Sequence, residues 1–147
     1  MNNMDKITEK LWLGNILAAL DINNLTKNGI RKILTLMMED FTNYSSLGNL
    51  FIHKKIKIGD SNLDNIIQYF GECLNFINGD EKVLVHCRAG VSRSATIVVA
   101  YLMWDKKMKY SDALDYTVHQ RFIAEPNDGF KDQLKIFEKL LIMIFIK

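Results

Sequence analysis

The segment KVLVHCRAGVSRSATIVVAYL, residues 82–102, constrains the fold more strongly than any other part of the chain. It begins as an apolar run with the character of a buried strand, which stops at His86 and Cys87. A short loop with one Gly, one Ser and two Arg follows, and a helix that is apolar on nearly all sides is predicted from Ser94 to Lys107. Because ligands in α/β folds bind beyond the carboxyl ends of strands, we expect a ligand at this loop.

Further strands and helices are predicted on both sides of this segment. Strands are predicted at residues 11–14, 30–36 and 55–58, and the alternation of isoleucine with lysine supports the last of them. Strands and helices alternate early in the chain and helices dominate late, which predicts an α/β fold with a mostly parallel central sheet flanked by helices. The predicted helices are ILAAL, INNLTKNG with Gly29 at its end, a helix carrying Leu63, Ile66, Ile67, Phe70, Leu74 and Ile77, one from Ser111 as N-cap to about Phe122, and a last one capped by Asn127 or Asp128.

Length, charge and cysteine content narrow the class of protein. A chain of 147 residues suits a single domain, residues 1–147. Its 19 basic and 17 acidic residues give a net charge of +2, too balanced to indicate nucleic acid or a membrane surface as a partner. Two cysteines, with no apolar export core at the start, predict free thiols and an intracellular protein, cytoplasmic and also nuclear.

The chain ends in an apolar run from Leu140 to Ile146, which is too short to span a bilayer. A buried last turn of a helix and a contact with a membrane surface are both consistent with such a run. We favour the buried turn, because the composition is otherwise typical of a soluble globular protein.

The loop after the strand has the features of an anion site. If it curls around one point, its backbone N–H groups converge there, and the helix that follows directs the positive end of its dipole at the same point. Gly90 permits a backbone conformation that a side chain would resist, and the guanidinium of Arg93 can hold two oxygens of a tetrahedral anion. The loop therefore predicts a site for a phosphate-like dianion. The predicted phosphate-binding residues are Arg88, Ala89, Gly90, Val91, Ser92 and Arg93.

The same positive field favours the thiolate form of Cys87, which is the nucleophilic form of cysteine. We therefore expect Cys87 to attack phosphorus and form a phosphocysteine that water then hydrolyses. Two interpretations of Ser94 are open. Its hydroxyl donates to the leaving sulfur, or it satisfies a backbone group at the start of the helix. His86 is predicted to be a structural residue that holds Cys87 in place. No metal or other cofactor is predicted, since no second ligand lies at metal-like spacing from His86.

The run His86-Cys87-Arg88-Ala89-Gly90-Val91-Ser92-Arg93-Ser94 resembles the signature loop of cysteine-dependent protein tyrosine phosphatases, in its dual-specificity variant. LWLGN, GIRKILTL and EPNDGF resemble further elements of that family, so the resemblance covers nearly the whole chain. It implies a protein tyrosine phosphatase-like fold in a small atypical member that is little more than a catalytic domain, monomeric, with phosphoproteins as substrates. The resemblance also implies that Asn127 supports the phosphate loop.

The family also requires a general acid that protonates the leaving oxygen. The resemblance implies Asp60 for this role, since it follows the strand at residues 55–58 and a carboxylate beyond a strand end can reach the mouth of the sheet. Asp64 is the alternative, although we expect it to start a helix, where a carboxylate suits the dipole. Cys73 is interpreted as a small core residue, with a resolving thiol for oxidised Cys87 as the alternative.

Three functions are consistent with these residues. We favour a protein phosphatase that acts on phosphotyrosine and on phosphoserine or phosphothreonine. The first alternative is a catalytically silent phosphopeptide-binding module, which usually lacks one of the catalytic residues, whereas Cys87, Arg93 and Asp60 are all present. The second keeps the chemistry but directs it at a lipid or RNA phosphate. The preference between tyrosine and threonine depends on pocket depth, which the polar stretch MEDFTNYSSLGN is predicted to set.

Overall fold

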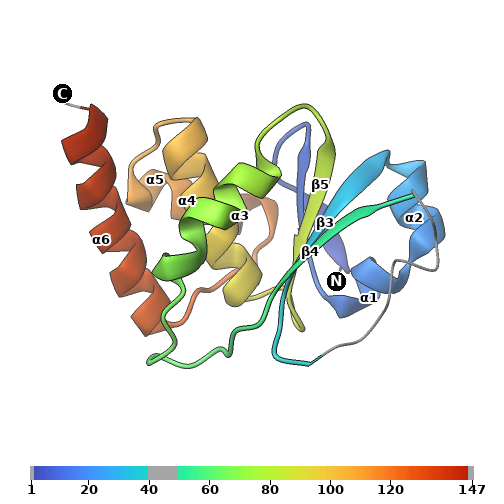
Figure 1. The fold of residues 1–147 in the computed structure, drawn as a ribbon, viewed down its shortest axis with the longest axis horizontal. Helices are drawn as coiled ribbons and strands as arrows, with labels where there is room; N and C mark the ends of the chain where they lie inside the picture. Colours follow the sequence, from blue (N-terminus) through green and yellow to red (C-terminus); the bar gives the residue numbers. More distant parts are fainter. Residues whose placement is uncertain (1, 40–49, 146–147) are drawn as a thin grey trace.

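A computed structural model describes residues 2–39 and 50–145 of the chain (Figure 1). Within these residues a five-stranded sheet has the order β1-β2-β5-β3-β4, in which only β1 is antiparallel to its neighbour. The strands are β1 (Met4–Lys6), β2 (Leu11–Gly14), β3 (Ile30–Leu36), β4 (Ile52–Ile56) and β5 (Lys82–His86). The predicted α/β fold with a mostly parallel sheet is therefore confirmed.

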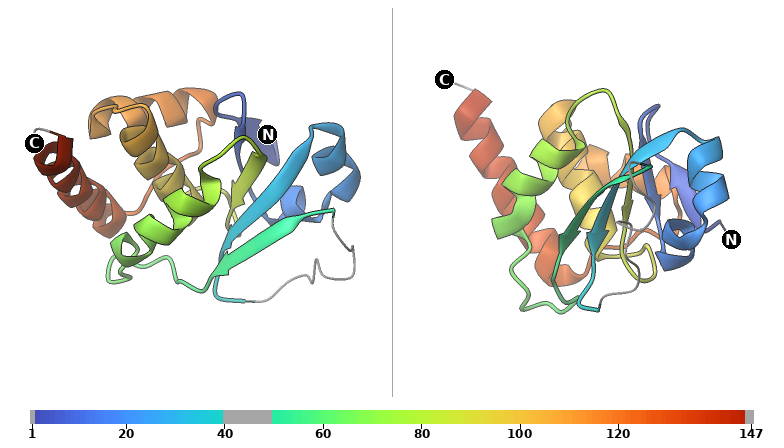
Figure 2. Two further views of the ribbon diagram at one scale, coloured as in Figure 1. Left: turned by 45° about the horizontal axis from the view of Figure 1, so that its top comes forward. Right: turned by 45° about the vertical axis from the view of Figure 1, so that its right-hand side comes forward.

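Helices cover both faces of the sheet (Figures 1 and 2). Two short helices lie on one face, and the longer helices from the second half of the chain lie on the other. The first pair comprises α1 (Ile16–Leu20) and α2 (Ile22–Lys27). The second layer comprises α3 (Phe70–Ile77), α4 (Arg93–Asp105), α5 (Tyr110–Gln120) and α6 (Asp128–Phe145), with the 3-10 turn η2 (Ile67–Tyr69) before α3.

The central strands are apolar on both sides because each contributes to two cores. On β5, Val83 and Val85 pack beneath α3 to α6, whereas Leu84 between them packs beneath α1 and α2. On β3, Leu34 belongs to the first core and Ile33 to the second. Side chains alternate across a strand, so a strand that is covered on both faces reads as a continuous apolar run.

Helix α4 is the central helix of the larger layer, as its sequence predicts. Every residue from Ser94 to Met103 is buried. Helices α3, α5 and α6 all pack against it, so it has no solvent-facing stripe over this stretch. This packing holds the start of α4, and with it the end of the loop that follows β5, in one position relative to the sheet.

The segment between β4 and α3 differs from the prediction. Strand β4 ends at Ile56, two residues before the predicted end, and the predicted helix from Leu63 begins only with η2. The Ser61 amide donates to the Asp64 carboxylate (2.8 Å) and the Asp64 amide to the Ser61 carbonyl (3.1 Å), so a closed turn forms in place of a helix. Leu63 lies at the tip of this turn and is 95% exposed. Asp64 therefore closes a turn and does not start a helix.

The N-termini of α5 and α6 are capped by two different kinds of group. The predicted N-cap Ser111 is wrong, because α5 starts one residue earlier and the Tyr110 amide donates to the Glu138 carboxylate of α6 (2.6 Å). A carboxylate of the neighbouring helix α6 thus accepts from an amide at the start of α5, as an N-cap side chain would. Asn127 does cap α6, since its side-chain oxygen accepts from the Phe130 amide (2.8 Å).

The apolar end of α6 is exposed, which contradicts the predicted buried last turn. Leu141 is buried, but Leu140, Ile142, Met143 and Ile144 are between 46% and 64% exposed. Helix α6 lies at the outer edge of its layer (Figure 1), so only one stripe of its surface faces the core. In residues 2–39 and 50–145, no helix combines the length and the apolar character that crossing a membrane requires. Residues 40–49, most of the stretch predicted to set pocket depth, lie outside the described residues.

Candidate active site

The loop of residues 87–92, here called the Cys87 loop, joins β5 to α4 at the carboxyl ends of the parallel strands. Its carbonyl groups all point to partners outside the loop. These pairs are Cys87 O with His86 Nδ1 (3.1 Å), Arg88 O with the Ile16 amide (3.1 Å), Ala89 O with Arg121 Nη2 (3.5 Å), Gly90 O with Arg121 Nε (2.9 Å), Val91 O with the Glu125 amide (2.7 Å), and Ser92 O with the Thr96 amide (2.9 Å). A loop whose carbonyls face outward presents its amides to the inside.

The amides of the Cys87 loop have no acceptor among the described residues. The N-terminus of α4 adds its own unpaired amides and the positive end of the helix dipole. Gly90 has a φ of +69°, and a Cβ there would lie 2.7 Å from Arg121 Nη2 and from the Gly14 carbonyl group. Glycine is therefore required at this position both for the backbone conformation and for space. The arrangement can bind an anion.

Cys87 and Ser94 meet at the centre of this arrangement. The sulfur of Cys87 lies 3.0 Å from the hydroxyl oxygen of Ser94, and both residues are buried. The distance suits a hydrogen bond from the hydroxyl to a sulfur that carries negative charge. Of the two readings of Ser94, this contact favours donation to the sulfur.

The Arg93 guanidinium is held at one end and has an unused donor at the other. Its Nη1 donates to the carbonyl of Ile58 (3.1 Å), which ties it to the segment after β4. Its Nε is buried and has no hydrogen-bond partner among the described residues. Buried donors are rarely left unpaired in proteins, and a bound oxyanion would satisfy this one.

Asn127 connects the Cys87 loop with the proposed acid. Its backbone amide donates to the Ser92 hydroxyl (2.9 Å), and its side-chain amide donates to the carboxylate of Asp60 (2.9 Å). Asp60 is exposed and lies two residues after Ile58, to which Arg93 is bonded. The carboxylate of Asp64, by contrast, closes its own turn with Ser61. Of the two candidate acids, only Asp60 shares a bonded partner with the loop.

Sequence reasoning did not identify two residues that hold the loop. Arg121 donates to two of its carbonyls from 31 and 32 residues away, and nothing in the local sequence indicates this contact. The hydroxyl oxygen of Thr35 lies 2.7 Å from His86 Nε2. The same oxygen lies 2.9 Å from His53 Nε2. A polar residue inside the buried run of β3 is an available signal for Thr35.

The tautomer of His86 follows from its two partners. The Cys87 carbonyl can only accept, so Nδ1 carries the proton and Nε2 accepts from the Thr35 hydroxyl. The Thr35 oxygen then accepts from Nε2 of His53. Burial lowers the pKa of His86 from its usual 6.5 to about 4, although the bond to Cys87 acts in the opposite direction. His86 is therefore neutral at pH 7.

The buried, neutral His86 predicts a loss of stability in acid. The unfolded chain takes up this proton near pH 6.5 and the folded chain only near pH 4, so the contribution is fully present above pH 6.5 and is lost as the pH falls toward 4. We expect the free energy of unfolding to fall by roughly 3 kcal/mol more in the wild type than in His86→Asn across this window. Urea unfolding at pH 7.5 and pH 4.5 measures the difference, and equal falls in both proteins would contradict it.

The second thiol of the chain lies on a different element from Cys87. Cys73 is fully buried on α3, and burial raises the pKa of its thiol to about 12, with Glu72 acting in the same direction. It is a core residue that stays protonated at neutral pH. No cluster of three or more His, Cys, Asp or Glu side chains able to hold a metal occurs in the part of the chain that the structure describes.

Comparison with known proteins gives the family. The profile described as "Dual specificity phosphatase, catalytic domain" matches residues 11–140, which is most of the chain and includes the whole Cys87 loop. The chain belongs to the dual-specificity phosphatase family. This agrees with the resemblance seen in residues 86–94. The Cys87 loop described above lies within the part of the chain that the family profile matches.

Relatives of this phosphatase domain include two curated proteins and a crystal structure. MAP kinase phosphatase with leucine-rich repeats protein 1 of Dictyostelium discoideum is 44% identical over 139 residues, which cover 92% of this chain and 16% of that protein. Dual specificity protein phosphatase 22 of Xenopus tropicalis is 39% identical over 142 residues, which cover 94% of this chain and 66% of that protein. The crystal structure of human tyrosine phosphatase-like serine/threonine/tyrosine-interacting protein has a TM-score of 0.88 at 35% identity and covers 95% of this chain and 97% of that one. The chain spans less than two thirds of the length of both curated relatives.

Proposed function

We propose that this chain is a protein phosphatase that hydrolyses phosphotyrosine, phosphoserine and phosphothreonine monoesters through a phosphocysteine intermediate. The observation that carries the proposal is the Cys87 loop, whose carbonyls are all bonded to partners outside it, which leaves its amides available for an anion at the start of α4. Membership of the dual-specificity phosphatase family supports the same reaction.

In the first step the thiolate of Cys87 attacks phosphorus and the bond to the ester oxygen breaks. The loop amides and the Nε of Arg93, which lacks a partner among the described residues, bind the three equatorial oxygens as charge moves onto them. Asp60 gives its proton to the departing oxygen, so a phenol or an alcohol leaves as the neutral product. Asn127 holds the Asp60 carboxylate and the loop in one arrangement during this transfer.

In the second step water attacks the phosphocysteine and the phosphorus–sulfur bond breaks. Asp60, now a carboxylate, accepts a proton from the attacking water. Ser94 donates a hydrogen bond to the departing sulfur across the 3.0 Å contact, which stabilises the thiolate that re-forms. The products are inorganic phosphate and the starting enzyme, and no metal takes part in either step.

The same proposal covers substrate, assembly and location. We infer phosphoprotein substrates and a monomer in which residues 1–147 form one catalytic domain, supported by a single sheet that contributes to both cores. A reduced, cytoplasmic and also nuclear environment is supported by the two free thiols.

A silent phosphopeptide-binding module is the second candidate. The observation that favours it is the similarity to a human protein that is described as tyrosine phosphatase-like and as interacting with serine, threonine and tyrosine. Against it stands the presence in this chain of Cys87, Arg93 and Asp60, each with the contacts described above.

An aryl-phosphate assay separates these two candidates. We expect turnover that vanadate inhibits and that an added chelator leaves unchanged. Initial rates on phosphopeptides, phosphoinositides and 5′-triphosphate RNA then identify the substrate class, and we expect the phosphopeptides to be hydrolysed fastest. Vanadate binding without turnover would establish the silent module, and faster hydrolysis of the lipid or the RNA would overturn the protein substrate.

A further inference from the structure

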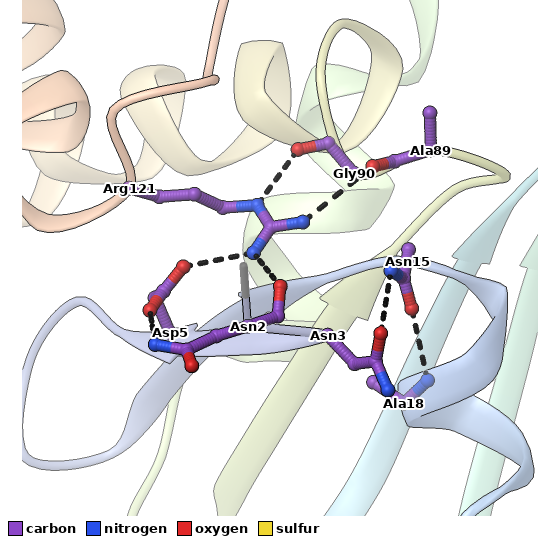
Figure 3. Close-up of polar contacts among 8 residues, drawn as sticks. All are labelled: Asn2, Asn3, Asp5, Asn15, Ala18, Ala89, Gly90 and Arg121. Carbon is purple, nitrogen blue, oxygen red and sulfur yellow. Dashed lines mark hydrogen bonds and ion pairs between the residues drawn. The ribbon is translucent and has the colours of Figure 1, made fainter.

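Arg121 heads the largest fully buried side chains among the described residues, although it carries a charge. Figure 3 shows its guanidinium between the Cys87 loop on one side and the N-terminal segment of the chain on the other. Its Nε donates to the Gly90 carbonyl (2.9 Å) and its Nη2 faces the Ala89 carbonyl (3.5 Å). Its Nη1 donates to the Asn2 carbonyl (3.0 Å) and to the Asp5 carboxylate (2.8 Å).

The contacts of Arg121 depend on the fork shape of its guanidinium. Three nitrogens in one plane donate in different directions, which a lysine ammonium at the same place cannot reproduce. Asp5 neutralises the charge, and its side chain is 18% exposed against 1% for that of Arg121. A buried cation whose three nitrogens all donate hydrogen bonds in this way is costly to rearrange, so it holds its partners at fixed positions.

Strand β1, which carries Asp5, is short and lies at the edge of the sheet next to β2. Asn3, which precedes β1, is bonded to Asn15: its carbonyl accepts from the Asn15 backbone amide (2.9 Å). The Asn15 side-chain amide also donates to the side-chain oxygen of Asn3 (3.1 Å) (Figure 3). The next residue, Ile16, donates to the Arg88 carbonyl. The N-terminal segment is thus linked to the Cys87 loop in two ways, through Arg121 and through Asn15 and Ile16.

We propose that Arg121 is a positioning residue for the phosphatase reaction, which orients the amides of the Cys87 loop by holding two of its carbonyls, and that Asp5 on strand β1 fixes Arg121 in this role. The inference rests on the proposed function, because the loop that it concerns is the proposed phosphate site. An amide and the carbonyl of the preceding residue share one peptide plane, so a carbonyl that swings inward turns the next amide away from the anion. Strand β1 is therefore part of the catalytic scaffold.

The test compares Arg121→Lys and Asp5→Asn with the wild type in two measurements. Isothermal titration with tungstate reports oxyanion binding without turnover, and hydrolysis of an aryl phosphate reports kcat/KM on the same samples. We expect Arg121→Lys to weaken tungstate binding about tenfold and to lower kcat/KM by ~10²-fold, since small misplacements of a site cause losses of this order. Asp5→Asn keeps the acceptor but loses the charge, and we expect smaller losses, about threefold to tenfold, in the same direction.

Glu9→Gln is the matched control, because it removes the exposed Lys6–Glu9 ion pair of the same hairpin without touching the loop. It should leave both measurements unchanged. Circular dichroism melting confirms that each variant is folded at the assay temperature, and Asp5→Asn decides the test if Arg121→Lys does not fold. Folded variants with the tungstate affinity and kcat/KM of the wild type would give Arg121 a role in stability alone and overturn the inference. A wild type that neither binds tungstate nor hydrolyses the ester would instead overturn the proposed function.

Discussion

Cys87→Ser is expected to abolish hydrolysis of aryl phosphates and of phosphopeptides, with a loss of at least about 10⁴-fold in kcat. A serine hydroxyl stays protonated at neutral pH and has no base beside it in the described structure that would activate it, so the nucleophile disappears. The amides of the loop and Arg93 are unchanged, however, so tungstate affinity should stay within about threefold of the wild-type value. Steady-state kinetics together with isothermal titration check both expectations.

Cys73→Ala is the control for this variant, because it removes the other thiol of the chain from a buried site outside the loop. It should retain the wild-type kcat, whatever it does to stability. Substantial turnover by Cys87→Ser would contradict the phosphocysteine mechanism and indicate direct attack by water. If the mechanism holds, the same variant binds phosphopeptides without releasing phosphate, and a pull-down with it identifies substrates.

Asp60→Asn is expected to give the second largest loss, and the loss should depend on the leaving group. General acid catalysis typically contributes ~10²–10⁴-fold, so kcat/KM for an alkyl phosphate or for phosphothreonine should fall by roughly 10³-fold. An aryl ester with a strongly electron-withdrawing ring needs little protonation, so its kcat/KM, which does not include hydrolysis of the phosphocysteine, should fall by less than about tenfold. A plot of log kcat/KM against leaving-group pKa for both proteins shows the difference as a steeper slope in the variant.

Asp64→Asn is the matched control for the acid. It changes the same functional group four residues away, where the carboxylate accepts from the Ser61 amide and closes a turn. It should alter stability without changing the dependence on the leaving group. Equal losses for good and poor leaving groups in Asp60→Asn would contradict the acid assignment, and a leaving-group effect in Asp64→Asn would transfer the role to that residue.

Asn127 connects the Cys87 loop with the segment that carries Asp60. Its backbone bonds the Cys87 loop through Ser92 while its side chain bonds Asp60, and it also caps α6. The Arg93 bond to the Ile58 carbonyl makes a second connection between the same two segments. The proposed acid and the proposed anion site are thus parts of one hydrogen-bonded unit, although Asp60 and Cys87 are 27 positions apart in the sequence.

Features that depend on neighbouring residues could be predicted from the sequence by itself. The buried strand ending at His86, the loop with its one glycine, and the helix that follows lie within one continuous segment, and their backbone conformations depend on residues a few positions apart. The apolar runs of β3 and β5 likewise indicated strands covered on both faces. The proposed roles of Cys87, Arg93 and Ser94 could be derived from the sequence for the same reason, since these residues are close in the chain.

Only the tertiary structure decided what holds that segment in place. The loop carbonyls are bonded to Ile16, Arg121 and Glu125, which come from three other parts of the chain. The choice between Asp60 and Asp64, the cap of α5 by Glu138 and the exposure of the last turns of α6 likewise depend on which elements pack together. A hydrogen bond between residues 30 or more positions apart depends on the packing of whole helices and strands against each other. No local pattern of residue types records such packing.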